Sequence, residues 1–259
     1  MLETEFDTST PNRLIWRVVE IAKIVDETPT VKSLVLDVPG WPGHQPGQHV
    51  DVRLTAEDGY QAQRSYSIAS EPETARLMLT VELIEGGEVS PYLTSDIRPA
   101  DKFELRGPIG GYFVWTVATG GPLFLVAGGS GVAPLMSMLR YRMAAKCTTP
   151  ALLLFSSRTF EDIIYREELD QMAARNEGLR VVYTLTRRQP SGWTGGARRI
   201  DRSMLASVGP SVTARPKIFI CGPTSLVESA AQSLLELGYE RNLIKTERFG
   251  PTGTWSGVG

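Results

Sequence analysis

The stretch LFLVAGGSGVAPLMSMLR, residues 123–140, decides the fold. It passes from an apolar run through Gly128, Gly129 and Gly131 into residues with helical spacing. Glycines between a strand and a helix let the backbone approach a pyrophosphate, which amides at the helix start then hold. Pro134 stands where the common G-x-G-x-x-G fingerprint has its third glycine, and proline suits a first helical turn. The stretch therefore predicts a nucleotide-binding strand–loop–helix unit.

Ser130 suggests a rival interpretation, because a serine in a strand-to-helix glycine turn resembles a hydrolase nucleophile. That motif needs G-x-S-x-G, and Val132 stands two residues after the serine. The two histidines, His44 and His49, precede the serine and lack spaced cysteine or carboxylate partners for a metal. The sequence therefore argues against hydrolase chemistry and against a metal site. We expect both histidines at the rim of the first domain.

The second half of the chain alternates strands of buried type with helical stretches. Strands are expected at 122–128, 151–157, 179–186 and 216–222. Helices are expected around 132–145, 160–175 and 224–237. Repeated strand–helix order is the signature of a doubly wound parallel sheet. We therefore predict an α/β nucleotide-binding domain over residues 119–259.

The first half has the shorter period of antiparallel strands. Runs rich in β-branched residues, separated by Gly, Pro and Asp clusters, lie at 14–25, 30–38, 48–54, 64–70, 76–84 and 101–108. Residues 90–97 predict a single short helix. This spacing of short strands favours a small antiparallel β-barrel or β-sandwich. We predict this domain over residues 1–118, with the boundary inside the stretch 116–121.

The composition of the 259 residues fits a globular protein of two domains. There is no run of about 18 apolar residues for membrane insertion, and the polar, acidic start is unlike a signal peptide. Two cysteines, Cys147 and Cys221, give no disulfide framework and suit a reducing compartment. We therefore expect the cytoplasm.

Charge is divided unevenly along the chain. Residues 1–116 carry 10 basic and 18 acidic residues, whereas residues 117–259 carry 17 and 11. The positive excess of the second half either reflects drift in surface composition or receives an anionic ligand. Because the basic residues are scattered without interleaved aromatics, the sequence argues against nucleic-acid binding.

The second strand of the α/β domain ends where doubly wound folds reach the adenosine ribose of a dinucleotide. An acid there accepts from the ribose 2′-hydroxyl, whereas an arginine favours a 2′-phosphate. The candidates are Ser157 and Arg158, followed by Tyr165 and Arg166. Without an acid at the strand end, the sequence favours NADPH over NADH. Arg166 is equally compatible with a solvated helix charge that pairs with Asp170.

Seven motifs follow one another along the chain in an order that is specific as a set. They are RSYSIAS (64–70), GGEVSPYL (86–93), GPIGGYF (107–113), GGSGVAP (128–134), SSRT (156–159), CGP (221–223) and ERFGPTG (247–253). In these motifs the chain resembles the ferredoxin–NADP reductase superfamily, in particular its bacterial branch of oxygenase and flavin-linked reductases. The resemblance runs from Trp16 to Gly253. It implies an FAD-binding β-barrel domain followed by an NAD(P)H-binding α/β domain.

For FAD, the resemblance implies that the R-x-Y-S strand binds the flavin. Arg64 would pair with the pyrophosphate, Tyr66 would stack along the flavin, and Ser67 would hydrogen-bond near the flavin N5, where hydride arrives. Further contacts would come from Ser65, Ile68, Val81 and Leu83. The turn at a helix start would cradle the pyrophosphate with Gly86, Gly87, Val89 and Ser90. A plain hairpin turn with a helix cap is the alternative for that turn.

For the nicotinamide nucleotide, the resemblance places four loop residues on the nicotinamide side: Gly129, Gly131, Val132 and Pro134. It places Cys221, Gly222 and Pro223 at the end of the last strand, where the cysteine would position the reacting ring. The alternative for this cysteine is a small, inert core residue.

Two C-terminal residues complete the candidate catalytic set of Ser67, Cys221, Glu247 and Phe249. Glu247 and Phe249 match an acid and an aromatic that approach the flavin in relatives. Phe249 would occupy the place of the nicotinamide until NADPH displaces it. In plant-type members the chain ends on this aromatic, whereas ten residues follow it here.

Together these motifs imply a reductase that passes a hydride from NADPH to FAD and then electrons to a separate protein. Relatives with their own iron–sulfur domain carry C-x4-C-x2-C and a further cysteine, which two distant cysteines cannot supply. The acceptor implied is an iron–sulfur, haem or molybdenum protein, with free flavin or quinone as alternatives. A flavin reductase with diffusible flavin and a non-catalytic dinucleotide-sensing subunit stay open. Partner docking, a solvated basic face and 2′-phosphate binding are the three roles open to Arg187, Arg188, Arg198 and Arg199.

Overall fold

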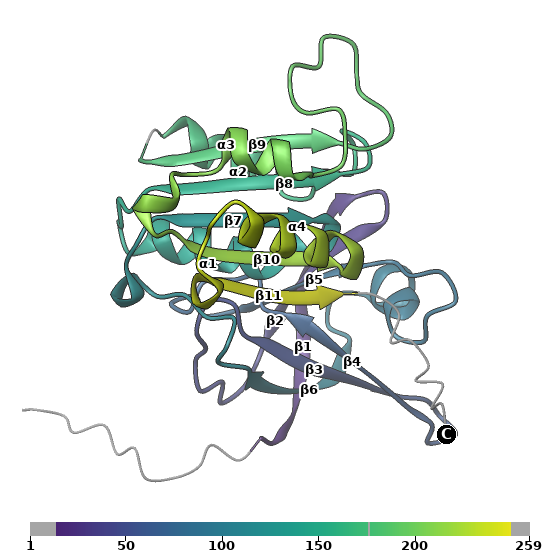
Figure 1. Ribbon diagram of the computed structural model, residues 1–259. Coiled ribbons are helices and arrows are strands. Elements are labelled where there is room, and N and C mark those ends of the chain that lie inside the picture. The colour runs from purple at the N-terminus through teal and green to yellow at the C-terminus, as the bar shows by residue number, and fades with distance from the viewer. Residues whose placement is uncertain (1–13, 176, 250–259) are drawn as a thin grey trace, which may run out of the picture.

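The computed structural model describes residues 14–175 and 177–249, which form two domains packed against each other (Figure 1). An antiparallel sheet of six strands comes first in the chain, and a parallel sheet of five strands follows with helices on both faces. This is the domain order that the change of hydrophobic period predicts, so the predicted fold class is confirmed.

The first sheet closes into a barrel. Its strands are β1 Trp16–Thr28, β2 Val31–Asp37, β3 His49–Thr55, β4 Gln61–Ser67, β5 Leu77–Glu82 and β6 Lys102–Ile109. Their order in the sheet is β4-β3-β6-β1-β2-β5, with every pair antiparallel. An isolated antiparallel bridge between Ile68 and Leu79 joins the two edge strands. The inward side chains of alternate positions, such as Val50, Val52 and Leu105, form the barrel core.

The short helix expected at 90–97 is confirmed as a single π-helical turn, Tyr92–Asp96. The hydroxyl of Thr94 donates to the carbonyl of Ser90 at 2.7 Å. Leu93 is buried in the barrel core, which holds the turn against the end of the sheet.

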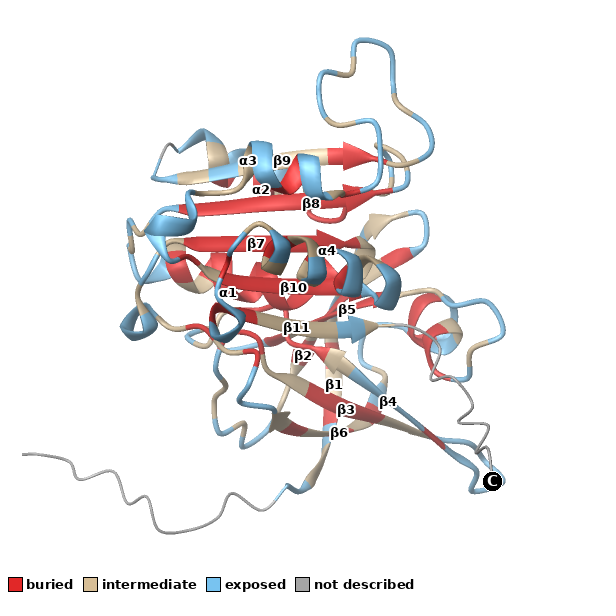
Figure 2. Ribbon diagram, viewed as in Figure 1, coloured by how far each residue is buried: buried red, intermediate tan, exposed pale blue. Residues whose placement is uncertain are grey.

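The second sheet is parallel and reverses its strand order once. Its strands are β7 Leu123–Gly128, β8 Ala151–Ser157, β9 Leu179–Leu185, β10 Lys217–Pro223 and β11 Ile244–Phe249. The order β11-β10-β7-β8-β9 places the reversal between β7 and β10. Figure 2 shows that β7, β8 and most of β10 are buried, as expected for a parallel sheet covered on both faces.

Helices cover both faces of this sheet. One face packs against α1 Val132–Ala144 and α2 Arg166–Ala174, and the other against α3 Arg202–Val208 and α4 Thr224–Glu236. Within residues 14–175 and 177–249, no helix is long and apolar enough to cross a bilayer.

Helix α1 is buried on nearly all sides because it lies between the parallel sheet and the barrel. One side packs against the sheet in a shared apolar cluster. On the barrel side, Ser137 donates to the carbonyl of Ser70 at 2.6 Å, and Arg140 donates to the carbonyl of Ala69 at 2.7 Å. The helix therefore has no polar face of the usual width, and it joins the two domains.

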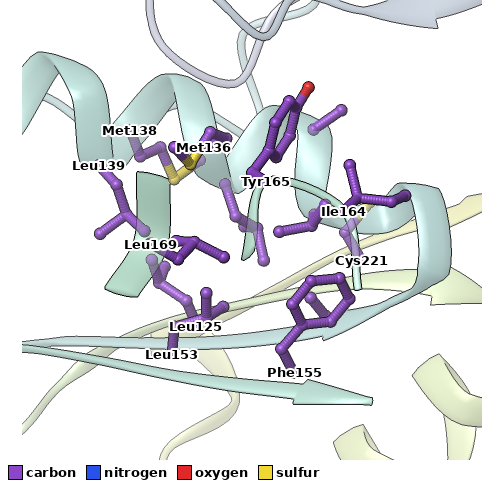
Figure 3. Packing of buried hydrophobic residues seen from close by; sticks show 14 of the residues in the cluster. Leu125, Met136, Met138, Leu139, Leu153, Phe155, Ile164, Tyr165, Leu169 and Cys221 are labelled. Atoms are coloured by element: carbon purple, nitrogen blue, oxygen red, sulfur yellow. The ribbon is translucent and has the colours of Figure 1, made fainter. Parts of the chain in front are cut away.

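Strand β5 forms the barrel side of the seam between the domains. The alternate residues that face the second domain are Met78, Thr80 and Glu82. The hydroxyl of Thr80 is hydrogen-bonded to Ser33 Oγ at 2.8 Å and to the hydroxyl of Tyr165. The Tyr165 hydroxyl points out of the apolar cluster of α1 and α2 (Figure 3), and burial raises its pKa to about 12. The seam is therefore a paired polar layer.

The helix expected over 160–175 begins only at Arg166. Ahead of it, Asp162 accepts hydrogen bonds from the backbone N and hydroxyl of Thr159, which form a turn. Tyr165 then adopts a left-handed φ of 58°, which an α-helix does not allow. The expected helix start was therefore wrong by six residues.

The sequence did not predict β11 or α3. Strand β11 lies at the edge of the parallel sheet and carries Lys245, Glu247 and Arg248, so it has no apolar run. Helix α3 has only seven residues. The connection from β6 to β7 contains a short 3₁₀ turn, Val117–Thr119, and the exact boundary after residue 118 stays a prediction.

Candidate functional site

A cleft of ≈ 980 Å³ opens between the two domains at the carboxyl ends of the parallel strands. Doubly wound sheets bind ligands where their strand order reverses, and the ends of β7 and β10 lie here. The volume lies at the upper end of the range for small-molecule sites, about 300–1,000 Å³. Predicted site residues that line the cleft are Arg64, Ser65, Tyr66, Ser67, Gly86, Gly87, Val89, Ser90, Gly129, Ser157, Arg158, Pro223 and Phe249.

Strand β4 forms the barrel wall of the cleft, and its exposure falls along the chain from Arg64 through Tyr66 to Ser67. Ser65 is held by a hydrogen bond from its hydroxyl to Asp51 at 2.6 Å. Ser67 is 5% exposed, and its Oγ is the one buried side-chain oxygen or nitrogen in the described part of the chain without a hydrogen-bond partner. Buried hydroxyls are normally satisfied, so this atom is placed to bond a ligand.

The turn after β5 is compact. Gly86 has a φ of 72°, and a side chain at Gly87 would lie 3.0 Å from the carbonyl oxygen of Ile84. Ser90 Oγ accepts from the backbone N of Ile84 at 3.1 Å, and Val89 is buried in the barrel core. The backbone at the start of the following turn can therefore approach an anion closely.

The glycine loop joins β7 to α1 through a 3₁₀ turn, Gly129–Gly131. Gly129 has a φ of 53° and lines the cleft. A side chain at Gly131 would lie 2.3 Å from the carbonyl oxygen of Cys221, so this glycine allows the loop to pack against β10. The residues predicted for the nicotinamide side that do not line the cleft are Gly131, Val132, Pro134, Cys221 and Gly222.

A carboxylate ties this loop to the barrel. Glu82 Oε2 accepts from Ser130 Oγ at 2.7 Å, and both residues line the cleft. Neither was predicted, although the two-residue period of β5 puts Glu82 on the same face as Thr80. The predicted barrel residues that do not line the cleft are Ile68, Val81 and Leu83. Val81 points into the barrel core, on the opposite face of β5.

At the end of β8, Ser157 and Arg158 line the cleft, as does Arg199 from the loop after β9. Ser157 Oγ donates to the carbonyl of Asp162 at 2.8 Å. Asp162 also lines the cleft, but its Oδ2 accepts from the backbone N and hydroxyl of Thr159 at 3.1 and 2.9 Å. One oxygen of the acid that lines this part of the cleft is therefore engaged, and the two arginines supply positive charge.

Tyr165 and Arg166, the other candidates of this segment, do not line the cleft. Tyr165 lies in the seam, 3% exposed. The Arg166 guanidinium lies 4.5 Å from the centre of the Phe160 ring. Its expected alternative partner, Asp170, instead accepts from a tyrosine of β9 at 2.9 Å.

Strands β10 and β11 pair Cys221 with Glu247 and Pro223 with Phe249. Cys221 is 0% exposed within the apolar cluster of Figure 3, and burial raises the pKa of its thiol well above the usual value. A thiol of this kind stays neutral and unreactive. Burial raises the pKa of Glu247 to about 7, so this carboxyl can hold or release a proton near neutral pH. Pro223 and Phe249 line the cleft, but the predicted catalytic residue Glu247 does not. Residues 250–253 of the last motif lie outside the described residues.

Comparison with known proteins agrees with this two-domain arrangement. An oxidoreductase FAD-binding domain matches residues 19–114, and an oxidoreductase NAD-binding domain matches residues 125–232. NADH-cytochrome b5 reductase 1 of Aspergillus oryzae is 32% identical over 203 residues, which cover 75% of this chain and 68% of that protein. The chain belongs to the ferredoxin–NADP reductase family. The predicted resemblance is thereby confirmed.

A further curated relative and one solved structure are also similar to this chain. The glycine betaine monooxygenase reductase subunit of Pseudomonas aeruginosa is 30% identical over 239 residues, 90% of this chain and 64% of its own length. The chain therefore spans less than two thirds of that relative. The flavohem-like FAD/NAD-binding domain of nitric oxide dioxygenase from Vibrio cholerae has the same fold, with a TM-score of 0.80 and 22% identity over 91% of this chain and 99% of that one.

FAD fits the barrel wall of this family member. The unpartnered hydroxyl of Ser67, the flat ring of Tyr66 and the guanidinium of Arg64 lie along one strand of the cleft. The narrow turn at Gly86 and Gly87 gives a backbone that a phosphate can approach.

Proposed function

We propose that this chain is a flavoprotein reductase that takes a hydride from NADPH onto FAD and passes electrons to a separate redox protein. One observation carries the proposal: a single cleft is lined by residues of both nucleotide motifs, and it contains the unpartnered hydroxyl of Ser67. The names of the relatives, a monooxygenase reductase subunit and a cytochrome b5 reductase, support it.

The barrel wall would hold FAD. Arg64 would bind the pyrophosphate through a charge-assisted hydrogen bond, and the turn of Gly86 and Gly87 would add backbone contacts. Tyr66 offers an apolar ring for the flavin, and desolvation raises the pKa of its hydroxyl, which keeps the ring neutral. Ser67 would bond the flavin at the buried end of the strand.

Bound FAD supplies the redox chemistry, because it accepts a hydride from a nicotinamide and releases electrons one at a time. The chain itself aligns the two ligands and excludes water from between them. Phe249 covers part of the cleft from β11. Glu247 lies on the same strand outside the cleft lining, and burial raises the pKa of its carboxyl to about 7. Cys221 would act through packing behind the loop rather than as a nucleophile.

We infer a preference for NADPH over NADH from the wall of the cleft that the α/β domain forms after β8 and β9, here called the second wall. Arg158 and Arg199 both line it, and Oδ2 of the acid in the same part of the lining, Asp162, already accepts two hydrogen bonds from Thr159. The relative from Aspergillus oryzae is named for NADH, so both nucleotides belong in any test.

The proposed acceptor is a one-electron carrier on a separate chain, such as the iron–sulfur or haem component of an oxygenase, or a molybdenum protein. The names of the relatives support this class, since one is a reductase subunit of a monooxygenase and the other reduces cytochrome b5. The proposed compartment is the cytoplasm, supported by the two free cysteines.

The absorbance of the purified protein tests the proposal. We expect a yellow protein that NADPH bleaches without oxygen, and that then reduces cytochrome c or a purified oxygenase component. A colourless protein that consumes NADPH only with added flavin would favour a flavin reductase instead. Nucleotide binding with no bleaching in the presence of FAD would favour a sensing subunit and overturn the proposal.

A further inference from the structure

Arg64, the residue proposed to bind the FAD pyrophosphate, is paired with an acid in the same cleft. Its Nη2 lies 2.7 Å from Glu88 Oε2, and its Nη1 donates to the carbonyl of Gln63 at 2.7 Å. Arg64 and Glu88 both line the cleft, with side chains 50% and 46% exposed. The guanidinium therefore already holds a carboxylate at the position where it would face a phosphate.

Tyr60 fixes this carboxylate from the other side. Its hydroxyl donates to Glu88 Oε1, while Glu88 Oε2 accepts from Arg64. The backbone N of Tyr60 donates to Asp58 Oδ1 at 2.9 Å, which orders the turn between β3 and β4. The hydrogen bonds from Tyr60 and Arg64 lower the pKa of Glu88, so its carboxylate is ionised at neutral pH. Both of its oxygens are thus engaged.

Glu88 also stands within the turn that is proposed to cradle the same phosphate, one residue after Gly87. A pyrophosphate that enters this turn meets a like charge, which opposes its binding. The guanidinium of Arg64 is at the same time hydrogen-bonded to the carboxylate of Glu88. Carboxylates and phosphates bind guanidinium groups through the same N–H donors. Binding therefore requires the exchange of one anion for another on Arg64.

We propose that Glu88 competes with the FAD pyrophosphate for Arg64 and thereby keeps the flavin exchangeable. The inference rests on the proposed function and deepens it, because it concerns how firmly the same site holds FAD. An exposed ion pair is weak, so the exchange stays reversible. Tyr60 controls the competition indirectly, because it holds Glu88 in reach of Arg64.

The test is the affinity of the apoprotein for FAD, measured by quenching of flavin fluorescence. Glu88→Gln keeps the size of the side chain and removes its charge, so we expect FAD to bind about fivefold more tightly, the range of one exposed ion pair. Glu57→Gln, which removes a charge at the exposed β3–β4 turn outside the cleft lining, is the matched control and should leave the affinity unchanged. Riboflavin has no phosphate, so its affinity should be the same for the wild type and Glu88→Gln.

A double-mutant cycle with Arg64→Ala separates competition from simple repulsion. We expect most of the gain from Glu88→Gln to disappear in the Arg64→Ala background, because only the like-charge repulsion remains there. If the full gain persists there, or if wild type and Glu88→Gln bind FAD equally, the competition is refuted while the proposed function stands. If neither protein binds FAD at all, the proposed function falls and this inference with it. Tyr60→Phe should give a smaller gain than Glu88→Gln, and a loss of affinity would contradict the role of Tyr60.

Discussion

The seam and the cleft are two parts of one domain contact, and they treat polar atoms in opposite ways. In the seam, Arg140 is bonded to the carbonyl of Ala69 at 2.7 Å and to Glu168 at 2.6 and 2.8 Å, and Tyr165 is bonded across the domains. In the cleft, the buried hydroxyl of Ser67 has no partner. The seam therefore fixes how the domains sit, and the cleft keeps bonding capacity for a ligand.

The same strand serves both regions. Thr80 of β5 lies in the seam and also lines the cleft, whereas the side chain of Glu82, two residues on, is hydrogen-bonded to Ser130 of the glycine loop. A ligand in the cleft thus meets a wall whose position the seam has already set. This comparison predicts that substitutions in the seam change stability, while substitutions in the cleft change ligand binding.

The largest effect is expected for Arg140→Ala. It removes the partners of a buried carbonyl and of Glu168, so the free energy of unfolding should fall by about 3 kcal/mol. Urea unfolding measures this loss. Arg202→Ala, which breaks an exposed pair with Glu236, is the control and should cost less than about 1 kcal/mol. Equal losses of unfolding free energy for the two variants would contradict the prediction that hydrogen bonds in the seam contribute more to stability than exposed ion pairs.

Glu247 makes stability depend on pH. Its pKa is about 7 in the folded protein and near 4.5 when exposed, so between these values the folded state binds more protons than the unfolded chain. Stability should therefore fall as pH rises from 4.5 to 7, by on the order of 2 kcal/mol. Glu247→Gln should flatten the dependence in urea unfolding at pH 5 and pH 8. A parallel decline in both proteins would show that other groups cause it.

Arg158→Ala tests the second wall of the cleft. Loss of a charge-assisted bond to the 2′-phosphate should weaken NADPH binding about tenfold and leave NADH within about twofold. Titration of the protein with each nucleotide measures both affinities. The control is Arg188→Ala, an exposed residue paired with Glu161 outside the cleft lining. Equal weakening of NADPH and NADH would mean that the 2′-phosphate binds elsewhere.

The smallest effect compares one hydroxyl from each region. Thr80→Val leaves Ser33 and Tyr165 without a shared partner and should cost about 1 kcal/mol of unfolding free energy. Ser67→Ala removes a hydroxyl that has no partner, so the unfolding of the ligand-free protein should change by less than about 0.5 kcal/mol. Chemical denaturation of both variants without nucleotides measures the two losses of unfolding free energy. A larger loss for Ser67→Ala than for Thr80→Val would contradict the predicted difference between the seam and the cleft.

Much of the fold could be predicted because its signals are local. The glycine loop lies between a buried strand and a helix within 18 residues, and the strands of each domain have their own hydrophobic period. Strand β11 has no such signal, since four of its six side chains are polar. It becomes a strand only because it pairs with β10. Tyr165, which precedes the late start of the expected helix, is likewise placed by a distant contact, since its hydroxyl is hydrogen-bonded to Thr80 of the barrel.

The candidate site was predicted where a motif carries it and missed where contacts between domains create it. Arg64, Tyr66 and Ser67 follow from one quoted strand, and all three line the cleft. Glu82 gains its role from Ser130, 48 residues away, which no local pattern could indicate. The two-residue period of β5 would still have placed Val81 in the core rather than beside the flavin.

Because Gly131 has no side chain, the loop before α1 can pack directly against the end of β10. Because its Cα rests against the Cys221–Gly222 peptide, α1 cannot slide along its axis without displacing the end of β10. A bound molecule that displaced the loop would therefore also have to displace β10, which carries the neutral thiol of Cys221 and pairs with β11, the strand of Glu247. An alanine at this position would force the loop and the end of β10 apart, so this glycine sets the distance between them.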